Sequence, residues 1–451
     1  MAVKEQWRSG LGFVLAAAGS AVGLGNLWGF AYRASQGGGM VFLMLYLLIV
    51  VVVCLPLLVA EMALGRSTGR SPLVAPAVAG GRLWQPMGWL FVLVSFGILG
   101  FYVILMGWTG QTLLHALIHG LPQDKAIAQD FFDQIRGGQP AFLGQFLSLI
   151  LTSLVVACGV QKGIERLSRW GLPLLFILLI GLAIWAAGLQ GAHEGYRTFL
   201  LRWDANELLN PTTISNAFKQ AFFSIGAGIG AILAYASYLD RRAHLPRESV
   251  LIVGMDTAVG LLAGMVTFPL VMSFGLADAV SKSTIGTLFI TLPTGLSSLG
   301  MTGRLVAVLF FALAYIAAIT SSVSLLEVPV ASLMDRLGWT RVRAVCVSAV
   351  LTLLIGLPAV TGLPKLPGLS DAVSSLDVLG WMDSLFGGVL LILGGLFLTI
   401  LLGWVAPSRL RNDLNGCNTP PALQRLLLVM LRWVSLPVVT IGVIISVIEF
   451  L

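Results

Sequence analysis

Glycines interrupt an apolar segment near the start of the chain, where residues 19–29 read Gly-Ser-Ala-Val-Gly-Leu-Gly-Asn-Leu-Trp-Gly. Glycine costs about 1 kcal/mol relative to alanine in a helix, and a backbone polar group freed in hydrocarbon is costly unless something satisfies it. A bound ion or polar solute could satisfy such groups. The alternative is that these glycines let two membrane helices approach closely.

A second interruption lies far downstream, where residues 224–230 read Ser-Ile-Gly-Ala-Gly-Ile-Gly. Paired broken helices in corresponding positions of two halves of a chain point to the binding site of a transporter, and their free carbonyls are hard oxygen ligands suited to sodium. Asp256 lies inside a third apolar run. An acidic group in such a place is rare and functional by default, so we expect a cation as its partner.

The elements that must position these residues are membrane helices. Hydrophobic residues make up 57% of the 451, and charged residues make up 10%, whereas soluble domains carry about 25% charged residues. The fold class is therefore an all-α polytopic membrane protein. Eleven apolar runs are long enough to cross about 30 Å of hydrocarbon. They fall near residues 11–32, 40–65, 89–118, 141–160, 170–189, 212–239, 250–276, 305–334, 344–360, 385–406 and 426–451.

Charge predicts the orientation in the membrane. Most of the 27 Lys and Arg residues fall in the loops on one side of the eleven runs. By the positive-inside rule the N-terminus is cytoplasmic, and an odd number of spans puts Leu451 outside. We expect a multi-pass protein of the cell inner (plasma) membrane without a cleavable signal peptide. The net charge of +7 then reflects topology and not nucleic-acid binding.

Patterns typical of other functions are weak. His115 and His119 have the spacing of a metal pair, but no third ligand accompanies them, so interfacial polar residues are the better interpretation. The four cysteines show no metal spacing. The sequence contains no catalytic triad, phosphate loop or symmetric channel filter, which argues against an enzyme and against a channel.

The motifs resemble those of the neurotransmitter:sodium symporter family, in its bacterial amino-acid branch, from about Lys4 to about Trp404. The residues that carry the resemblance are Gly19–Asn26 with Trp28 and Phe30, Gly37–Gly39, Ala60–Arg66, Tyr235–Tyr238 and Thr320–Ser322. The resemblance implies a 5+5 inverted-repeat transporter fold with two broken helices. The first repeat would comprise residues 1–189 and the second residues 190–406, with a linker and an extra C-terminal helix at 407–451.

The resemblance also implies two sodium ions as the cofactors and a small-molecule amino acid as the partner. The first sodium site would use Ala21, Asn26, Ser224 and Asp256, together with the carboxylate of the substrate. The second would use Gly19, Val22, Ala317, Thr320 and Ser321. Without the first glycine motif, Thr320 and Ser321 would more often be ordinary helix-bonding hydroxyls.

For the substrate, the resemblance implies that backbone amides near Gly23 and Gly25 and the hydroxyl of Tyr102 hold the carboxylate, close to Ala21 and Ser224. The side chain would lie in a pocket lined by Ile98, Tyr102, Phe223, Gly226, Ile229, Ser321 and Leu325. This lining favours a hydrophobic L-amino acid. Because Asp256 supplies a fixed negative charge, chloride is not expected to be required. The alternative function is a substrate-binding sensor that has lost coupled transport.

Supporting and gating residues follow from the same resemblance. Glu61 would hydrogen-bond the unwound backbone of both broken helices, whereas Glu327 is left without a role. The inner gate would comprise Lys4, Trp7, Tyr238 and Asp335. Gly163 and Pro173 keep a glycine–proline spacing that is associated with local unwinding of the fifth span.

The outer gate departs from the family pattern, since Gly29 stands where an arginine is usual. The aspartate that usually pairs with that arginine would be Asp383. We expect Arg33, one helical turn further out, to form the ion pair with Asp383 instead. Lys219 is the alternative cation, and a third possibility is that Arg33 only reaches the lipid headgroups.

Three connecting segments complete the sequence-based picture. Residues 281–300 would form a re-entrant hairpin in the outer vestibule, and residues 361–384 would form a long outer loop. Residues 406–423 would form a partly flexible linker before the last helix.

Overall fold

The computed structural model describes residues 5–276, 284–361 and 378–450. Nine of the helices in this part of the chain are long and apolar enough to cross a membrane. Two further spans are interrupted, at residues 22–23 and 226–230, which brings the total to the eleven that the sequence predicts. Elsewhere the spans continue as helix through prolines and short π-helical turns, because unpaired backbone groups are costly in hydrocarbon.

The first five spans run to Ala187. They are α1 (Gly10–Ala21) with η1 (Gly25–Gly29) and α2 (Phe30–Gln36); α3 (Met40–Ile49) with η2 (Val50–Cys54) and α4 (Leu55–Thr68); α6 (Gln85–Ile118); α8 (Gly138–Ala157); and η4 (Val160–Glu165) with α9 (Arg166–Ala187). Shorter elements connect them: α5 (Ala75–Gly80), η3 (Arg82–Trp84) and α7 (Lys125–Arg136).

The remaining spans are α11 (Pro211–Ile225) with α12 (Ala231–Ala236); α13 (Leu245–Ser273); α17 (Gly300–Leu337); α18 (Arg341–Thr361); α20 (Val378–Met382) with η8 (Asp383–Leu390), α21 (Leu391–Ile400) and η9 (Leu401–Val405); and α23 (Pro421–Val429) with η10 (Met430–Ser435) and α24 (Leu436–Phe450). The connecting elements are α10 (Ala192–Tyr196), η5 (Arg197–Leu201), η6 (Ala205–Leu209), α15 (Thr284–Gly286), η7 (Thr287–Thr291), α16 (Leu292–Ser297) and α22 (Pro407–Gly416).

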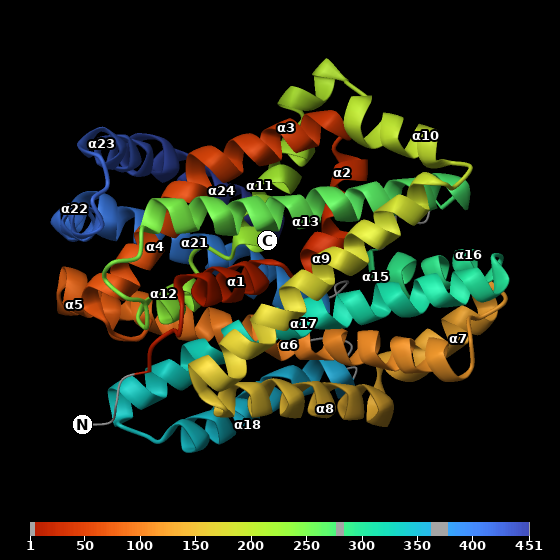
Figure 1. The fold of residues 1–451 in the computed structure, drawn as a ribbon, viewed down its shortest axis with the longest axis horizontal. Coiled ribbons are helices and arrows are strands. Elements are labelled where there is room, and N and C mark those ends of the chain that lie inside the picture. The colour runs from red at the N-terminus through yellow and green to blue at the C-terminus, as the bar shows by residue number, and fades with distance from the viewer. Residues whose placement is uncertain (1–4, 277–283, 362–377, 451) are drawn as a thin grey trace.

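The interrupted spans lie among the long helices. Figure 1 shows α1 and α12 inside the molecule, with α13 on one side and α17 and α6 on the other. Helices α22 and α23 lie at one end of the molecule in Figure 1, and α24 runs from that end towards its middle. The division into repeats at residues 189 and 406 stays a prediction.

The segment before α17 returns into the protein. Phe289 of η7 stacks on Phe132 of α7 with ring centroids 5.3 Å apart, and it meets Trp108 of α6 edge-on at 6.0 Å. Residues 281–283 of the predicted hairpin lie outside the described residues. So does most of the predicted outer loop at 361–384, of which residues 378–384 begin the tenth span.

Within the predicted linker at 406–423, residues 407–416 form helix α22, which the sequence analysis did not predict. Leu410 and Leu414 are buried under this helix. Asp413 forms an ion pair with Arg66 at the end of α4, at 2.8 Å. Sequence reasoning missed the helix because its polar residues look like a loop, whereas its order comes from contacts with α4.

Candidate functional site

The first interruption places a bare stretch of backbone beside other helices. Helix α1 ends at Ala21, Val22 is extended with φ −74° and ψ 102°, and the amide of Asn26 donates to the carbonyl of Gly23 at 3.1 Å. A Cβ atom at Gly23 would lie 2.9 Å from the Tyr102 hydroxyl and 3.1 Å from Ser321 Oγ. Only glycine fits this approach.

The second interruption is made by three glycines with positive φ. Gly226, Gly228 and Gly230 have φ of 66°, 101° and 88°, values that side chains other than glycine's rarely adopt. Glu61 supports this break by accepting hydrogen bonds from the amides of Gly228, at 3.0 Å, and Leu233, at 3.2 Å. The contacts of Glu61 reach only this break in the described residues, whereas the sequence reasoning expected it to support both.

A first oxygen cluster (Asn26, Ser224 and Asp256) forms where the two broken spans meet α13, and it contains three of the four residues predicted for the first sodium site. Asn26 Nδ2 donates to Asp256 Oδ1 at 2.6 Å and to Ser224 Oγ at 2.7 Å, and Ser224 Oγ donates to Asp256 Oδ2 at 2.6 Å. All three polar side chains are at most 1% exposed. A buried carboxylate with an amide and a hydroxyl around it offers the hard ligands that a small cation takes.

A second oxygen cluster (Gly19, Val22, Ala317, Thr320 and Ser321) joins α1 to α17. Ser321 Oγ lies 3.0 Å from the carbonyl oxygen of Val22, 3.3 Å from that of Gly19 and 3.2 Å from that of Ala317. Thr320 Oγ1 lies 3.0 Å from the same Ala317 carbonyl. The structure therefore brings together all five residues that the resemblance predicts.

A small cavity lies next to both clusters. Its volume is about 40 Å³, which is room for one or two water molecules and less than any amino acid requires. All seven residues of the predicted side-chain pocket line it: Ile98, Tyr102, Phe223, Gly226, Ile229, Ser321 and Leu325. Ala21, Gly23 and Asn26 also line it. A larger solute would require these side chains to move apart.

Three lining residues were missed by the sequence reasoning: Ser20, Ala231 and Ser324. Ser20 Oγ donates to Ser324 Oγ at 2.6 Å, which puts a hydroxyl pair on an otherwise apolar wall. Two signals could have found them, since Ser20 belongs to the glycine motif and Ser324 follows Ser321 by about one helical turn. Gly25 and Ser224, which were predicted to contact substrate, do not line the cavity.

Tyr102 and Phe223 are two aromatic side chains that line the cavity. The amide of Leu24 donates to the Tyr102 hydroxyl at 3.2 Å, so this hydroxyl is already turned toward the first break. Gly25 packs so closely under Phe223 that an added Cβ would lie 2.8 Å from Cε1 of the ring. The role of Gly25 in this structure is thus to admit Phe223.

Comparisons with known proteins bear on the identity of the chain. The model of the sodium:neurotransmitter symporter family matches residues 4–134 and 140–448. The chain belongs to this family. It is 32% identical to an uncharacterized sodium-dependent transporter of Methanocaldococcus jannaschii, over 91% of this chain and 84% of that protein. It is 36% identical to another from Bacillus subtilis, over 78% of each chain.

A solved structure agrees with the family assignment. The crystal structure of MhsT in complex with L-phenylalanine matches with a TM-score of 0.88 and 34% identity, over 100% of both chains. The protein is therefore a sodium-dependent transporter with the inverted-repeat fold of this family, and its relatives are transporters and not enzymes.

The symporter has a second cavity on the far side of Phe223. Its volume is about 130 Å³, and Arg33, Lys219, Asp383 and Phe223 are among the residues that line it. Arg33 Nη1 donates to Gln220 Oε1 at 2.6 Å and forms no ion pair with Asp383 in this structure. Arg33 thus faces the same cavity as Asp383, but its guanidinium is hydrogen-bonded to the side-chain amide of Gln220.

Lys219, the alternative cation for Asp383, forms an ion pair with Glu449 of α24. Glu449 also accepts a hydrogen bond from Ser215 at 2.8 Å. The last helix therefore contributes a carboxylate to this cavity, which the sequence reasoning missed because Glu449 lies 234 residues from Ser215.

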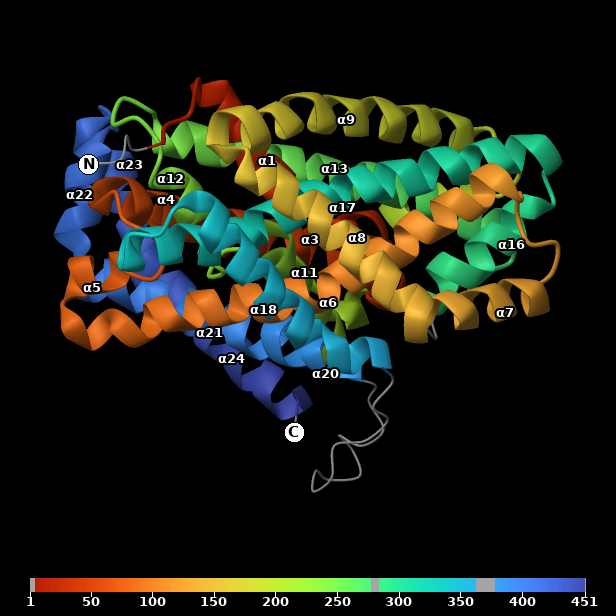
Figure 2. The same ribbon diagram turned by 90° about the horizontal axis from the view of Figure 1, so that it is seen from below.

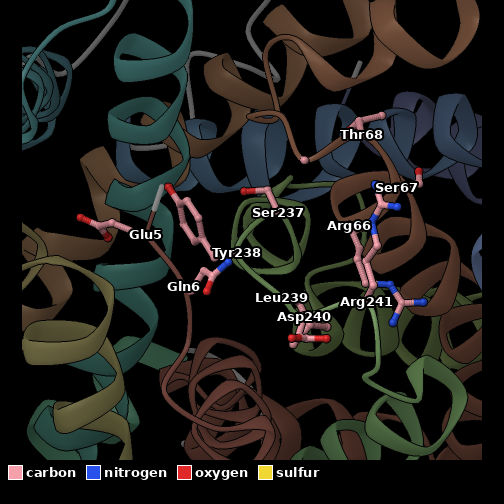
Figure 3. A pocket seen from close by; sticks show the side chains of 11 residues that line it. Glu5, Gln6, Arg66, Ser67, Thr68, Ser237, Tyr238, Leu239, Asp240 and Arg241 are labelled. Carbon is pink, nitrogen blue, oxygen red and sulfur yellow. The ribbon is translucent and has the colours of Figure 1, made fainter. Parts of the chain in front are cut away.

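A third cavity, of about 460 Å³, opens at the end of the symporter that holds the N-terminus, between the chain start, the end of α4 and the end of α12. Figure 3 shows Glu5, Gln6 and Tyr238 on one side of it and Arg66 and Arg241 on the other.

Three of the predicted inner-gate residues, Trp7, Tyr238 and Asp335, form hydrogen bonds near this cavity. Trp7 Nε1 donates a hydrogen bond to the carbonyl of Tyr235 at 2.8 Å. The backbone amide of Trp7 donates to the carbonyl of Tyr238. Asp335 accepts hydrogen bonds from the amide and hydroxyl of Ser71, both at 2.9 Å, and pairs with Arg70 at 3.4 Å. Lys4 lies outside the described residues.

Glu327, which had no role in the sequence-based picture, belongs to a buried charge network. Arg341 donates to both of its carboxylate oxygens, at 2.8 and 2.9 Å, and Tyr238 donates to it at 2.9 Å. Arg341 also binds Glu5 at 2.8 Å. The sequence reasoning counted Arg341 only as a loop charge, because its partners are set by packing.

The fifth span is close to the start of α1. Glu165 accepts the amide of Arg8 at 2.8 Å, and the Ser9 hydroxyl lies 3.3 Å from its other oxygen. Residues 160–165 form π-helix η4, and α9 continues through Pro173 without a break. The local unwinding associated with Gly163 and Pro173 is thus limited to η4 in this structure.

Proposed function

We propose that this symporter couples the uptake of an amino acid to sodium by alternating access. The observation that carries the proposal is the position of the two oxygen clusters, which lie against the same break at Val22–Gly23 with the lined cavity beside them. A solute bound in that cavity would contact the break and complete the ion sites.

Two sodium ions would travel with the substrate. The first would take the carbonyl of Ala21 and the side chains of Asn26, Ser224 and Asp256, with the substrate carboxylate as a further ligand. The second would take the five groups of the second cluster. The hydrogen bonds that now join these groups would be replaced by bonds to the ion.

The substrate would be an amino acid with an apolar side chain, as is L-phenylalanine in the solved structure of MhsT. Ile98, Phe223, Ile229 and Leu325 supply the apolar contacts. The Tyr102 hydroxyl and the amides near Gly23 would hold the carboxylate, as backbone amides at the N-terminus of a helix do. Gly25 would affect substrate binding indirectly, because it leaves room for the ring of Phe223.

The membrane potential would supply part of the driving force. Moving one charge through 100 mV provides about 2.3 kcal/mol, so two sodium ions would provide about 4–5 kcal/mol. This requires insertion in the inner (plasma) membrane with the N-terminus cytoplasmic and Leu451 outside. Of the Lys and Arg residues in loops, most lie on the N-terminal side, which supports that orientation.

The alternative function is a sensor that binds an amino acid without transporting it. The observation that favours it is Gly29, which stands where the family usually has the outer-gate arginine. A sensor would bind substrate in sodium but move none across the membrane.

Uptake into proteoliposomes tests the proposal and separates it from the alternative. A mixture of radiolabelled amino acids is offered with an inward sodium gradient and, in a matched sample, with sodium equal on both sides. Accumulation only with the gradient is the expected result. Binding without accumulation would favour the sensor, and accumulation without sodium would contradict the proposal.

A further inference from the structure

An apolar groove lies on the outside of the bundle, away from the proposed transport site. It has a volume of about 520 Å³ and is formed by the end of α8, by η4 and α9, and by the middle of α17. Figures 1 and 2 both show α9 crossing α17 close to α8. The walls are almost entirely hydrocarbon, with Leu154, Val155, Leu167 and Ile316 among them.

Along one edge of the groove the side chains change from charged to apolar. Lys162, Arg166, Trp170 and Leu174 follow each other at four-residue intervals, and all four line the groove. The order runs from two cations through an amphipathic indole to an aliphatic side chain. A phospholipid has the same order of chemistry, from charged headgroup through the interfacial region to the acyl chain.

The two cations have no partner within the described part of the protein. Neither Lys162 nor Arg166 donates a side-chain hydrogen bond or forms an ion pair there, and both side chains are exposed. Arg169, one turn away, is different because it pairs with Glu165 at 3.0 Å. Lys162 and Arg166 are therefore free to meet a negative charge at the mouth of the groove.

The stretch of α9 that lines the groove is about as long as one leaflet of a bilayer is deep. The eight-residue step from Arg166 to Leu174 corresponds to a rise of about 12 Å along α9. Half of the hydrocarbon core of a bilayer is about 15 Å thick. Trp170, which is 74% exposed, lies half-way between Arg166 and Leu174. Indole rings favour this depth, between headgroups and acyl chains.

We propose that this groove binds one acidic phospholipid of the leaflet on the N-terminal side, with its phosphate between Lys162 and Arg166 and an acyl chain along Trp170 and Leu174. Basic pockets between membrane helices on the cytoplasmic side bind lipids of this charge. A zwitterionic lipid would fill the apolar part equally well, so the two cations provide the preference. The site does not depend on which solute the protein transports.

Quenching of Trp170 by brominated lipids tests the proposal. The protein is reconstituted into phosphatidylcholine vesicles that contain a small fraction of either phosphatidylglycerol or phosphatidylcholine with brominated acyl chains. The contribution of Trp170 is the difference between wild type and Trp170→Phe. Brominated phosphatidylglycerol is expected to quench this contribution several-fold more than brominated phosphatidylcholine at the same mole fraction.

Two double variants remove the same charge at different places. Lys162→Gln with Arg166→Gln should abolish the preference for phosphatidylglycerol. Arg242→Gln with Arg247→Gln, exposed cations on the same side outside the groove, should keep it. Equal quenching by the two lipids in wild type would overturn the proposal, because it would mean an ordinary lipid contact. Loss of the preference in both double variants would also overturn it, because net charge alone would then explain binding.

Discussion

Ser321 of α17 and Val22 at the break in the first span lie 3.0 Å apart, from the hydroxyl of the one to the carbonyl oxygen of the other. Val22 lies one residue beyond the end of α1, and its carbonyl accepts this hydrogen bond from α17. The contact therefore ties the break in the first span to α17.

Substrate binding should require sodium, with lithium a poor replacement, because the second cluster supplies five oxygen ligands. Ser321→Ala should weaken sodium binding by about tenfold or more, since a hydrogen bond or ligand to a charged group contributes about 1.5–3 kcal/mol. Titration calorimetry with the amino acid in sodium, lithium and choline salts measures this. Ser332→Ala is the control, because Ser332 bonds only to Val328 of its own helix. Equal affinity in sodium and choline would contradict sodium coupling.

Transport should not depend on chloride. Asp256 provides a fixed negative charge beside the first cluster, so an added anion is not required to balance the ion there. Replacing chloride by gluconate should leave uptake unchanged, whereas Asp256→Asn should weaken sodium binding by about tenfold or more through loss of the Coulomb attraction. The argument is wrong if gluconate abolishes uptake and Asp256→Asn performs like wild type in chloride.

Gly23→Ala should weaken substrate binding by about tenfold or more. The new methyl group would lie 2.9 Å from the Tyr102 hydroxyl and 3.1 Å from Ser321 Oγ, and overpacking of this kind costs about 1–3 kcal/mol. Gly254→Ala is the matched control, because its Cβ has open space around it on a regular helix. If both variants bind substrate like wild type, the backbone near Gly23 is not part of the site.

Arg33 should pair with Asp383 when the outer gate closes, leaving its present partner Gln220. Arg33→Gln and Asp383→Asn should then be non-additive, with a coupling of about 0.5–3 kcal/mol in a double-mutant cycle on substrate affinity. Lys219→Met and Asp383→Asn should be additive, because Lys219 is already bound to Glu449. Additivity of the Arg33 pair, or coupling of the Lys219 pair alone, would assign the gate to another cation.

Arg66→Lys should lower the thermal stability of the detergent-solubilised protein. The Arg66 guanidinium donates through Nε and Nη2 to the Asp413 carboxylate, at 2.8 to 3.2 Å, and a lysine cannot reproduce this two-nitrogen geometry. Arg136→Lys is the control, since its pair with Asp133 is exposed and such pairs contribute about 0–1 kcal/mol. Equal melting temperatures of the two variants would show that α22 is not held by this pair.

Local backbone chemistry was the part of the site that the sequence could predict. Glycines at 226, 228 and 230 indicate a break, because few other residues adopt those φ values. An isolated acidic residue in an apolar run, such as Asp256, indicates a polar cluster. The composition of each cluster came from the family resemblance.

Partners that are far apart in sequence could not be predicted in the same way. Glu327 forms an ion pair with Arg341 across the connection between α17 and α18. Lys219 forms an ion pair with Glu449 on the last helix. Which cation pairs with which carboxylate depends on how the helices pack. The hydrophobic periodicity of the sequence does not contain that information. Helix α22 was missed because its polar residues look like a loop, and the ion pair between Arg66 and Asp413 joins residues that are far apart in the sequence.

The anchoring of Glu5 has a consequence for the order of events during biosynthesis. Its carboxylate accepts the amide of Val160 at 2.9 Å and binds Arg341 at 2.8 Å, over a separation of 336 residues. At about 5–20 residues per second, a ribosome needs roughly 20–70 s to reach Arg341 after Glu5. The Glu5 carboxylate can therefore meet the Val160 amide once four spans have been made, but it gains its cationic partner only after eight.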